Sequence, residues 1–423
     1  MVINEPGKTI ALPIKTKQEF HSLLDEIVST GARRMLIHML EFEVESYIQA
    51  HAGVVDANGH RLVVRNGYGK SRSVTTSCGD IEIKTPRVDD RREGKKFLSK
   101  ILPPYLRRSP KVESLLPLLY LKGISTGKFE DTLRDFLGEG SAGLSPASIV
   151  KLKSNWEKEF AEWNDSPIDE DIVYIWADGV NMSIRLGEDD KICLLVIIGA
   201  TVDGSKKLLA IHPGYRESEE SWNFILNALK GRGLHEPMLA IGDGALGFWN
   251  ALRSVYGEIK TREQRCWVHK IANVLDKLPK RSQPDAKQLL HDMMRAETLA
   301  DADTTRAKFE TLYSAKYPKA VDCLVKDWTK LITFFSFPAE HWVTIRTTNP
   351  IESAFATVKA RTRTTKGAGS KTTAVAMAFK LLKESEKRWR RIRGYEHLKN
   401  LRMGLEYENG IVILNQTQQG AAS

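Results

Sequence analysis

The chain has 423 residues, of which 42% are hydrophobic and 27% are charged, and its net charge at neutral pH is +10. This balance supplies apolar side chains for packed cores and excludes a disordered chain, and a prior of about 150 residues per domain suggests two or three domains. The start of the chain has no apolar signal region, and the longest uncharged apolar run, residues 192–202, is too short to cross a bilayer, so we expect a soluble, cytoplasmic protein with no membrane partner.

The positive charge is concentrated near the carboxyl end of the chain. Residues 357–403 contain fourteen Lys or Arg residues against three Glu residues, a surplus of +11, so the rest of the chain is close to neutral in sum. A clustered surplus of cations is more typical of a nucleic-acid-binding segment than of a general means of staying soluble.

Residues 1–105 form the first predicted region. Up to about residue 60 the apolar spacing predicts helix, with Phe20, Leu23 and Ile27 on one face. From 61 to 88 the character changes, because RNGYGKSRSV is basic and rich in glycine while IEIKTPRV alternates like a strand. We therefore expect a small β-hairpin with a basic tip after the helical part.

Residues 106–165 carry three helical periods separated by turns that contain glycine. The third begins at Ser145-Pro146, a cap residue followed by a proline at the first helical position. Three short helices with tight turns suit a DNA-binding helix-turn-helix, although an ordinary three-helix bundle fits the same pattern. We favour the helix-turn-helix because Lys151 and Lys153 lie on the third helix, where phosphate contacts are expected.

A β-rich block opens the next predicted region, residues 170–265. Three strands are predicted at 171–186, 192–202 and 206–213, with tight turns at GEDD (187–190) and VDGS (202–205). A helix, a buried strand and a second helix follow, at 219–230, 238–242 and 245–256. Three antiparallel strands, a helix, a strand and a helix are the opening topology of an RNase H-like α/β fold.

Asp178 lies inside the first of these strands. The apolar residues around it keep an even-numbered alternation through position 178: Ile172, Tyr174, Trp176, Val180, Met182 and Ile184. A hairpin turn at Asp178-Gly179 is the alternative, but GEDD supplies a better turn. Asp178 is therefore predicted to lie on the apolar face in mid-strand, where an ionised carboxylate is costly unless it is paired or holds a cation.

Asp243 ends the strand MLAIG and precedes Gly244, so a turn or a helix cap is one interpretation of it. Its position favours another, because sites in open α/β sheets gather at the carboxyl ends of strands. In the predicted topology the first and fourth strands are neighbours. Asp178 and Asp243 are then expected to meet.

Residues 266–340 are predicted to be helical, and residues 341–403 to hold the last part of the core and a basic helix. Two apolar stripes mark the first segment: Val321, Leu324, Trp328 and Leu331, and Phe309, Leu312 and Tyr313. Apolar residues that predict one face of a long basic helix follow: Val375, Phe379, Leu382, Trp389 and Ile392. The cations predicted to hold DNA phosphates are Lys359, Arg361, Arg363, Lys387, Arg390 and Arg391. Residues 404–423 are predicted to be a flexible tail.

Glu352 lies in the stretch TTNPIES, which looks like a helix start. Asn349 suits the N-cap and Pro350 the first helical position, so Glu352 could reach back to the cap and favour the positive end of the helix. The alternative is a third acidic ligand beside Asp178 and Asp243. Two Asp and one Glu are what a two-metal phosphoryl-transfer site needs, with Mg²⁺ as the expected ion and Mn²⁺ able to substitute.

Cys266 and His269 form a C-x-x-H pair. The four cysteines have no paired spacing, which argues against a disulfide framework, and no second pair is placed to complete a zinc site with Cys266 and His269. On a helix that begins near 266 the two side chains lie one turn apart. A packed cysteine with a satisfied histidine is the plain interpretation.

These residues and their surroundings resemble the Mutator-type transposases of bacterial insertion sequences, the insertion-sequence 256 group. The resemblance extends from about residue 60 to about residue 400 and is specific when its segments are taken together. The segments are VRNGYGKSRSV, IKTPRV, LPPYLRRSP, YLKGIST, LSPASI, WADG, IGDGALGFWNAL, QRCWVHKIANVLDKLP and TTNPIESAFATVKARTRTTKG. Two segments depart from the usual forms, GVNMSIR after the first Asp and NPIES at the Glu, and neither removes a ligand.

The resemblance implies a DDE transposase with an α/β RNase H-like (retroviral-integrase-like) core and an all-α insertion, preceded by a mainly helical DNA-binding region. Asp178, Asp243 and Glu352 match the catalytic, metal-binding positions, and Cys266 and His269 match a Cys-x-x-His signature that could act near the active site. Asp243 and Glu352 are 109 positions apart, which leaves room for the insertion.

We therefore predict a DNA transposase of a bacterial insertion sequence, associated with the nucleoid. Its partners would be the terminal inverted repeats, target DNA and further copies of itself, in a homodimer or larger assembly. Both steps, cleavage and strand transfer, are in-line displacements at phosphorus and need no covalent enzyme intermediate. The alternatives are a transposase-derived DNA-binding protein without catalysis, which would have no use for an inward-facing Asp178, and an RNase H-like nuclease that cuts without joining.

Overall fold

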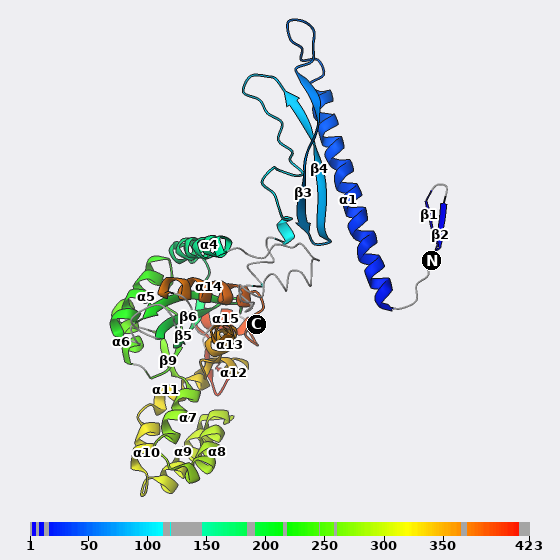
Figure 1. Ribbon diagram of the computed structural model, residues 1–423. Helices are drawn as coiled ribbons and strands as arrows, with labels where there is room; N and C mark the ends of the chain where they lie inside the picture. The colour runs from blue at the N-terminus through cyan, green and yellow to red at the C-terminus, as the bar shows by residue number, and fades with distance from the viewer. Residues whose placement is uncertain are drawn as a thin grey trace, which may run out of the picture. The chain divides into compact units, whose positions relative to one another are not determined.

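The computed structural model of the 423-residue chain consists of two compact units, Met1–Val150 and Lys151–Ser423 (Figure 1). The structure describes residues 2–5, 8–11, 17–112, 119, 146–183, 191–214, 218–244, 246–257, 260–364 and 370–413.

A long helix and a β-hairpin make up most of the described part of the first unit (Figure 1). Helix α1 spans Lys17–Ala50, and the antiparallel strands β3 (Val63–Thr76) and β4 (Gly79–Asp90) form the hairpin. Gly79, at the turn, has a φ of 96°, which glycine adopts without strain. The predicted hairpin is thus confirmed, with longer strands than expected. The prediction of a basic tip was wrong, because the basic segment RNGYGKSRSV forms part of β3 and the turn after Thr76 contains no Lys or Arg.

Apolar side chains join the helix to one face of the hairpin. Leu40 of α1 packs in one cluster with Val74, Ile81 and Ile83 of the hairpin. The prediction of helix from residue 1 was wrong at the start, where Val2–Glu5 (β1) and Lys8–Ala11 (β2) pair as antiparallel strands. Both segments contain β-branched residues, and the Pro-Gly sequence between them is a strong turn signal.

The predicted helix-turn-helix falls largely on residues 113–118 and 120–145, which lie outside the described residues. Its third helix is described as α4, Pro146–Asp165, and begins at the predicted proline.

A five-stranded mixed sheet is the centre of the second unit. Its strands are β5 (Ile172–Ser183), β6 (Lys191–Thr201), β7 (Lys206–Gly214), β8 (Leu239–Gly242) and β9 (Arg262–Arg265). The order is β7-β6-β5-β8-β9, with β5 antiparallel to β6 and parallel to β8. The first and fourth strands are therefore neighbours, as predicted, whereas β9 was not anticipated. The predicted GEDD turn lies outside the described residues; the VDGS turn is present, with Gly204 at a φ of 80°.

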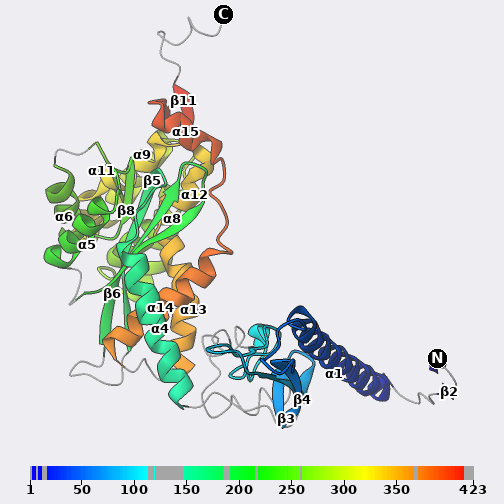
Figure 2. The same cartoon turned by 90° about the horizontal axis from the view of Figure 1, so that it is seen from above.

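Helices cover both faces of the sheet, so its central strands are buried on each side. Helices α5 (Glu219–Gly231) and α6 (Leu246–Tyr256) cover one face, where Trp222 and Trp249 pack in the core cluster. On the other face α13 (Asn349–Thr364) contacts β5 and α14 (Lys371–Glu386) contacts β7. Figures 1 and 2 show α4 beside α14, and Phe160 of α4 packs edge-on against Phe379.

An all-helical segment connects β9 to α13 and projects from one end of the sheet (Figure 1). It contains α7 (Trp267–Leu275), α8 (Gln283–Arg295), α9 (Leu299–Tyr313), α10 (Pro318–Val325), α11 (Trp328–Leu331) and α12 (Trp342–Ile345), with three short 3₁₀ turns, Lys280–Ser282, Thr333–Ser336 and Ala339–His341. Both predicted apolar stripes are buried except for Leu312, which is exposed. Phe309 and Tyr313 are one turn apart, whereas Leu312 lies on the neighbouring face.

The long basic helix predicted near the carboxyl end was wrong. Helix α14 ends at Glu386, and the next helix, α15, spans Glu396–Arg402. Between them the chain crosses to the β6–β7 turn, where the Ile392 N–H donates to the Gly204 carbonyl at 2.9 Å and Lys206 Nζ donates to the Arg390 carbonyl at 2.7 Å. These tertiary hydrogen bonds replace the helical ones.

Part of the predicted tail forms a small antiparallel hairpin, β10 (Glu406–Glu408) with β11 (Ile411–Ile413). Residues 414–423 lie outside the described residues. In the part of the chain that is described, no helix combines the length and apolar character that a membrane span requires.

Candidate active site

Asp178 lies in the middle of β5, opposite Val196 of β6, and only 8% of its surface is exposed. The predicted mid-strand position is confirmed. The neighbouring residues of β5 are buried on both faces of the sheet, so this part of the strand has no exposed polar face. Asp178 is unusual because it is a carboxylate inside a buried strand. Burial is the main reason why the pKa of Asp178 is raised to about 6; the nearby His269 opposes this shift and Asp243 adds to it.

Asp243 directly follows β8. In the parallel pairing of β5 with β8, Ala177 is opposite Gly242, so Asp178 and Asp243 are the next residues on neighbouring strands. The indole N–H of Trp249 donates to the Asp243 carbonyl at 2.9 Å and fixes the start of the following loop. The sheet topology thus places the carboxylate-bearing residues side by side, with Asp178 in mid-strand and Asp243 just beyond the end of β8, and the predicted neighbourhood of the two strands is confirmed.

Glu352 lies in the first turn of α13, which begins at Asn349, so Thr348 and not the predicted Asn349 precedes the helix. The Glu352 N–H donates to the Thr348 carbonyl at 3.3 Å. Its carboxylate is 42% exposed and lies 4.0 Å from His269 Nε2. Within the described residues, no backbone N–H of the helix start donates to this carboxylate, which weakens the capping interpretation.

His269 comes to the same place from α7. One ligand atom each from Asp178, His269 and Glu352 lie within 4.8 Å of one another. The neighbouring Cys266 sulfur is the main reason why the pKa of His269 is raised to about 9; burial opposes the shift, and Asp178 and Asp243 add to it. His269 Nδ1 has no well-aligned hydrogen-bond acceptor among the described residues, so we attribute the shift to charge rather than to a formed hydrogen bond.

Cys266 connects the two helix starts that carry His269 and Glu352. It is fully buried immediately before α7, and its sulfur accepts hydrogen bonds from the N–H of Thr348 at 3.3 Å and from its hydroxyl at 3.5 Å. Burial alone would raise the pKa of the thiol, but the interactions with His269 and Thr348 outweigh it and lower the pKa. The C-x-x-H pair therefore acts as a link next to the carboxylates, and no zinc-like cluster includes Cys266 among the described residues.

The donor set fits a hard divalent cation. Two oxygens bound to one Mg²⁺ at about 2.1 Å each are at most about 4.2 Å apart. The ligand atoms of Asp178, His269 and Glu352 lie within 4.8 Å of one another, so the cluster would contract slightly around an ion. The carboxylates suit both Mg²⁺ and Mn²⁺. A buried Asp178 with a raised pKa is also what an acidic site has before a cation compensates its charge.

The predicted phosphate-binding cations do not form one free surface. Lys151 is exposed and Lys153 half-buried on α4, and Lys359 is exposed on α13. Lys387 pairs with Glu384 and Arg391 with Asp203, while Arg390 is exposed after α14. The side chains of Arg361 and Arg363 lie outside the described residues.

Sequence reasoning missed three charged residues behind the site: Arg265, Lys270 and Asp327. Arg265 and Lys270 are buried and Asp327 is half-buried, and Lys270 Nζ is 2.5 Å from Asp327. The available signal was a pair of cations, Arg265 and Lys270, on either side of the apolar residues Cys266, Trp267 and Val268.

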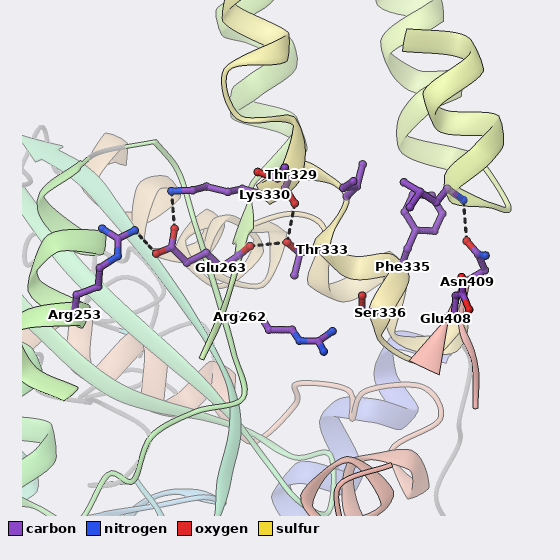
Figure 3. Close-up of a pocket in the computed structure, with 12 residues that line it drawn as sticks. Arg253, Arg262, Glu263, Thr329, Lys330, Thr333, Phe335, Ser336, Glu408 and Asn409 are labelled. Atoms are coloured by element: carbon purple, nitrogen blue, oxygen red, sulfur yellow. Dashed lines mark hydrogen bonds and ion pairs between the residues drawn. The ribbon is translucent and has the colours of Figure 1, made fainter. Parts of the chain in front are cut away.

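A charged pocket lies at the other end of β9 (Figure 3). Arg253 and Lys330 both reach Glu263, so these charges compensate one another. The Leu299 N–H donates to Asn409 Oδ1 at 2.8 Å across the same pocket. These contacts join β9, the all-helical segment and the terminal hairpin, which is a structural role.

Most of the chain is similar to known transposases. A family model described as "Transposase, Mutator family" matches residues 7–392. The transposase for insertion sequence element IS6120 of Mycolicibacterium smegmatis is 45% identical over 307 residues, 72% of this chain and 94% of its own length. The transposase for element IST2 of Acidithiobacillus ferrooxidans is 44% identical over 297 residues, 69% of this chain and all of its own length. The transposase for element IS256 in transposon Tn4001 of Staphylococcus aureus is 25% identical over 306 residues, 71% of this chain and 75% of its own length.

Proposed function

This chain belongs to the Mutator family of transposases, and we propose that Asp178, Asp243 and Glu352 form the metal-binding DDE site with which it cleaves and joins DNA. The supporting observation is that ligand atoms of Asp178 of β5, Glu352 of the first turn of α13 and His269 lie within 4.8 Å of one another. The strand pairing places Asp243 next to Asp178, one residue beyond the paired Ala177 and Gly242. The strand order, three antiparallel strands followed by two parallel ones, supports an RNase H-like core for this site.

The three carboxylates would hold the cations, Mg²⁺ or Mn²⁺, which polarise the phosphate and activate the attacking oxygen when bound. Asp178 pairs with Val196 of β6, and its neighbour Ala177 pairs with Gly242 of β8, so the backbone that carries Asp178 is held by the sheet. Glu352 is more exposed and lies at a helix start, where it can adjust as DNA enters. No serine or tyrosine nucleophile is needed, because both steps are direct displacements at phosphorus.

The substrate would be double-stranded DNA, first the terminal inverted repeats of the element and then the target. Residues 106–165 are proposed to read the repeats, and the cations of 357–403 to hold phosphates. Two ends have to be brought together before joining, so we propose that the working form is a homodimer or a larger assembly.

The test is Mg²⁺-dependent nicking of a supercoiled plasmid that carries the element's own ends. Glu352→Gln is expected to abolish nicking without changing the melting temperature. Glu220→Gln is the matched control, since Glu220 is exposed in the first turn of α5 and shares only the helix-start position. Retained nicking by Glu352→Gln, with a lowered melting temperature, would return Glu352 to a capping role and remove the triad.

A separate assay adds a DNA duplex with a free 3′-end that matches the element end. Joining of this end to target DNA is expected for the proposed transposase. Cleavage without joining under the same conditions would favour a nuclease.

A further inference from the structure

Two buried cations share one acid immediately behind the candidate site. Arg265 ends β9 and Lys270 lies on α7, and their side chains are only 9% and 3% exposed. Asp327, which precedes α11, is 2.5 Å from Lys270 Nζ and 3.5 Å from Arg265 Nε. Lys270 also donates to the Cys323 carbonyl at 2.7 Å, so its ammonium group is well satisfied.

The guanidinium of Arg265 is not satisfied in the same way. Its buried Nε has no hydrogen-bond partner, and within the described residues neither Nη1 nor Nη2 donates to a protein acceptor. The distance to Asp327 is that of an ion pair without hydrogen-bond geometry. A nearly buried guanidinium that keeps its donors unused is costly unless an anion completes it.

The unused end of Arg265 lies against the loop that carries Asp243. Arg265 is opposite Gly242 in the parallel pairing of β8 with β9, one residue before Asp243. A Cβ atom on the next residue, Gly244, would overlap Nη1, Nη2 and Cζ of Arg265. The glycine therefore leaves the space that the guanidinium fills beside the acidic cluster.

Arg265 is not there to neutralise the carboxylates. Its ion-pair partner is Asp327, and in the described part of the chain no ion pair joins it to Asp178 or Glu352. A site that collects three carboxylates would repel the DNA phosphate on which it acts. A planar guanidinium at its edge offers two parallel donors to phosphate oxygens, which a lysine does not.

We propose that Arg265 binds a non-bridging oxygen of the DNA phosphate that is cleaved, and that Asp327 and Lys270 are positioning residues that hold it there. This inference rests on the proposed function, because it assigns a DNA contact within that site. Asp327 comes from the all-helical segment, so this segment would help to place the phosphate contact.

The experiment measures DNA affinity in the Glu352→Gln background, so that DNA is held but not cut. One duplex carries the element end with an ordinary phosphate at the cleavage position, and a second carries a methylphosphonate there, tested as each of its two diastereomers. Arg265→Gln is expected to weaken binding of the ordinary duplex by a factor of about 10. With the diastereomer that lacks the contacted oxygen, the proteins with and without Arg265 should bind equally.

Arg262→Gln is the matched control, because Arg262 lies on the same strand but at the end away from the carboxylates and is expected to change neither affinity (Figure 3). An equal loss of affinity on all duplexes would mean that Arg265 acts only through the fold, and no loss on any duplex would mean that it makes no contact. Both results overturn the proposal.

A melt of each variant separates folding from binding, and Arg265→Lys, which keeps the charge and loses the fork, is the second variant if Arg265→Gln does not fold. Arg265→Lys is then expected to weaken binding of the ordinary duplex in part, and to leave binding of the diastereomer that lacks the contacted oxygen unchanged. The nicking test of Glu352→Gln decides the proposed function independently, so failure of either idea can be recognised separately.

Discussion

Asp327→Asn tests the ion network that holds Arg265. Asp327 is the shared acid of Lys270 and Arg265, and both cations are more than nine-tenths buried. Asparagine keeps the shape and removes the charge, which leaves two buried cations without a counter-ion. Breaking a buried pair in this way costs about 3–5 kcal/mol, so we expect the free energy of unfolding to fall by that amount.

The matched change is Lys270→Met. It removes one of the two cations, fills the same space with an apolar side chain and leaves Asp327 paired with Arg265. The Cys323 carbonyl loses a donor, and we expect a loss of only about 1 kcal/mol. The double variant is expected to be more stable than Asp327→Asn alone, because it carries one unpaired buried cation fewer.

The pH dependence of this difference follows from the pKa of Asp327. Burial alone would raise this pKa, but Lys270 and Arg265 outweigh it, so the pKa is lowered in the folded chain. A carboxyl with a lowered folded pKa stabilises the fold above its unfolded value, about 3.9, and loses this contribution as pH falls through the folded value. The difference in the free energy of unfolding between wild type and Asp327→Asn should therefore have its full size at pH 7 and become smaller below about pH 4.

Urea unfolding followed by tryptophan fluorescence measures this free energy. All nine tryptophans lie between residues 156 and 389, so the signal reports the second unit alone. A loss below about 1 kcal/mol for Asp327→Asn, or a larger loss for Lys270→Met, would refute the reasoning about the shared acid.

Three further predictions concern the site and its DNA. Gly244→Ala should abolish nicking, because the new Cβ displaces the Arg265 guanidinium, and wild-type rates in that variant would contradict the packing described here. Nicking should rise as pH increases through about 6, since burial raises the pKa of Asp178 and only its ionised form binds a cation; a flat profile between pH 5 and 7 would show that Asp178 does not titrate there. Arg390→Ala should reduce the slope of log DNA affinity against log salt concentration by about 1. Arg391→Ala should change this slope less, because Arg391 is already paired with Asp203. Equal slopes for the two variants would show that this ion pair does not keep Arg391 from contacting phosphate.

In residues 357–403 the sequence correctly shows an excess of positive charge, but the long basic helix predicted there was wrong. The surplus of cations in residues 357–403 is a property of the sequence alone. Whether each cation is free depends on acids elsewhere, and Asp203 of the β6–β7 turn takes Arg391. The same turn draws Ile392 out of the helical pattern, because the Gly204 carbonyl accepts the hydrogen bond that the Ile392 N–H would otherwise donate to the preceding helical turn.

The sequence by itself determined the kinds of most elements of the second unit, the position of each carboxylate within its element and the family. Local periodicity and turn residues carry that information, since they depend on neighbours within a few positions. Asp178 in mid-strand, Asp243 after a strand and Glu352 in a first helical turn were all predictable for this reason.

Only the tertiary structure decided what meets at the site. The strand β9, the contact of Thr348 with Cys266 and the place of Arg265 beside Gly244 join segments that are distant along the chain. None of them leaves a periodic trace, because burial of a cation or a thiol depends on which partner the fold brings to it.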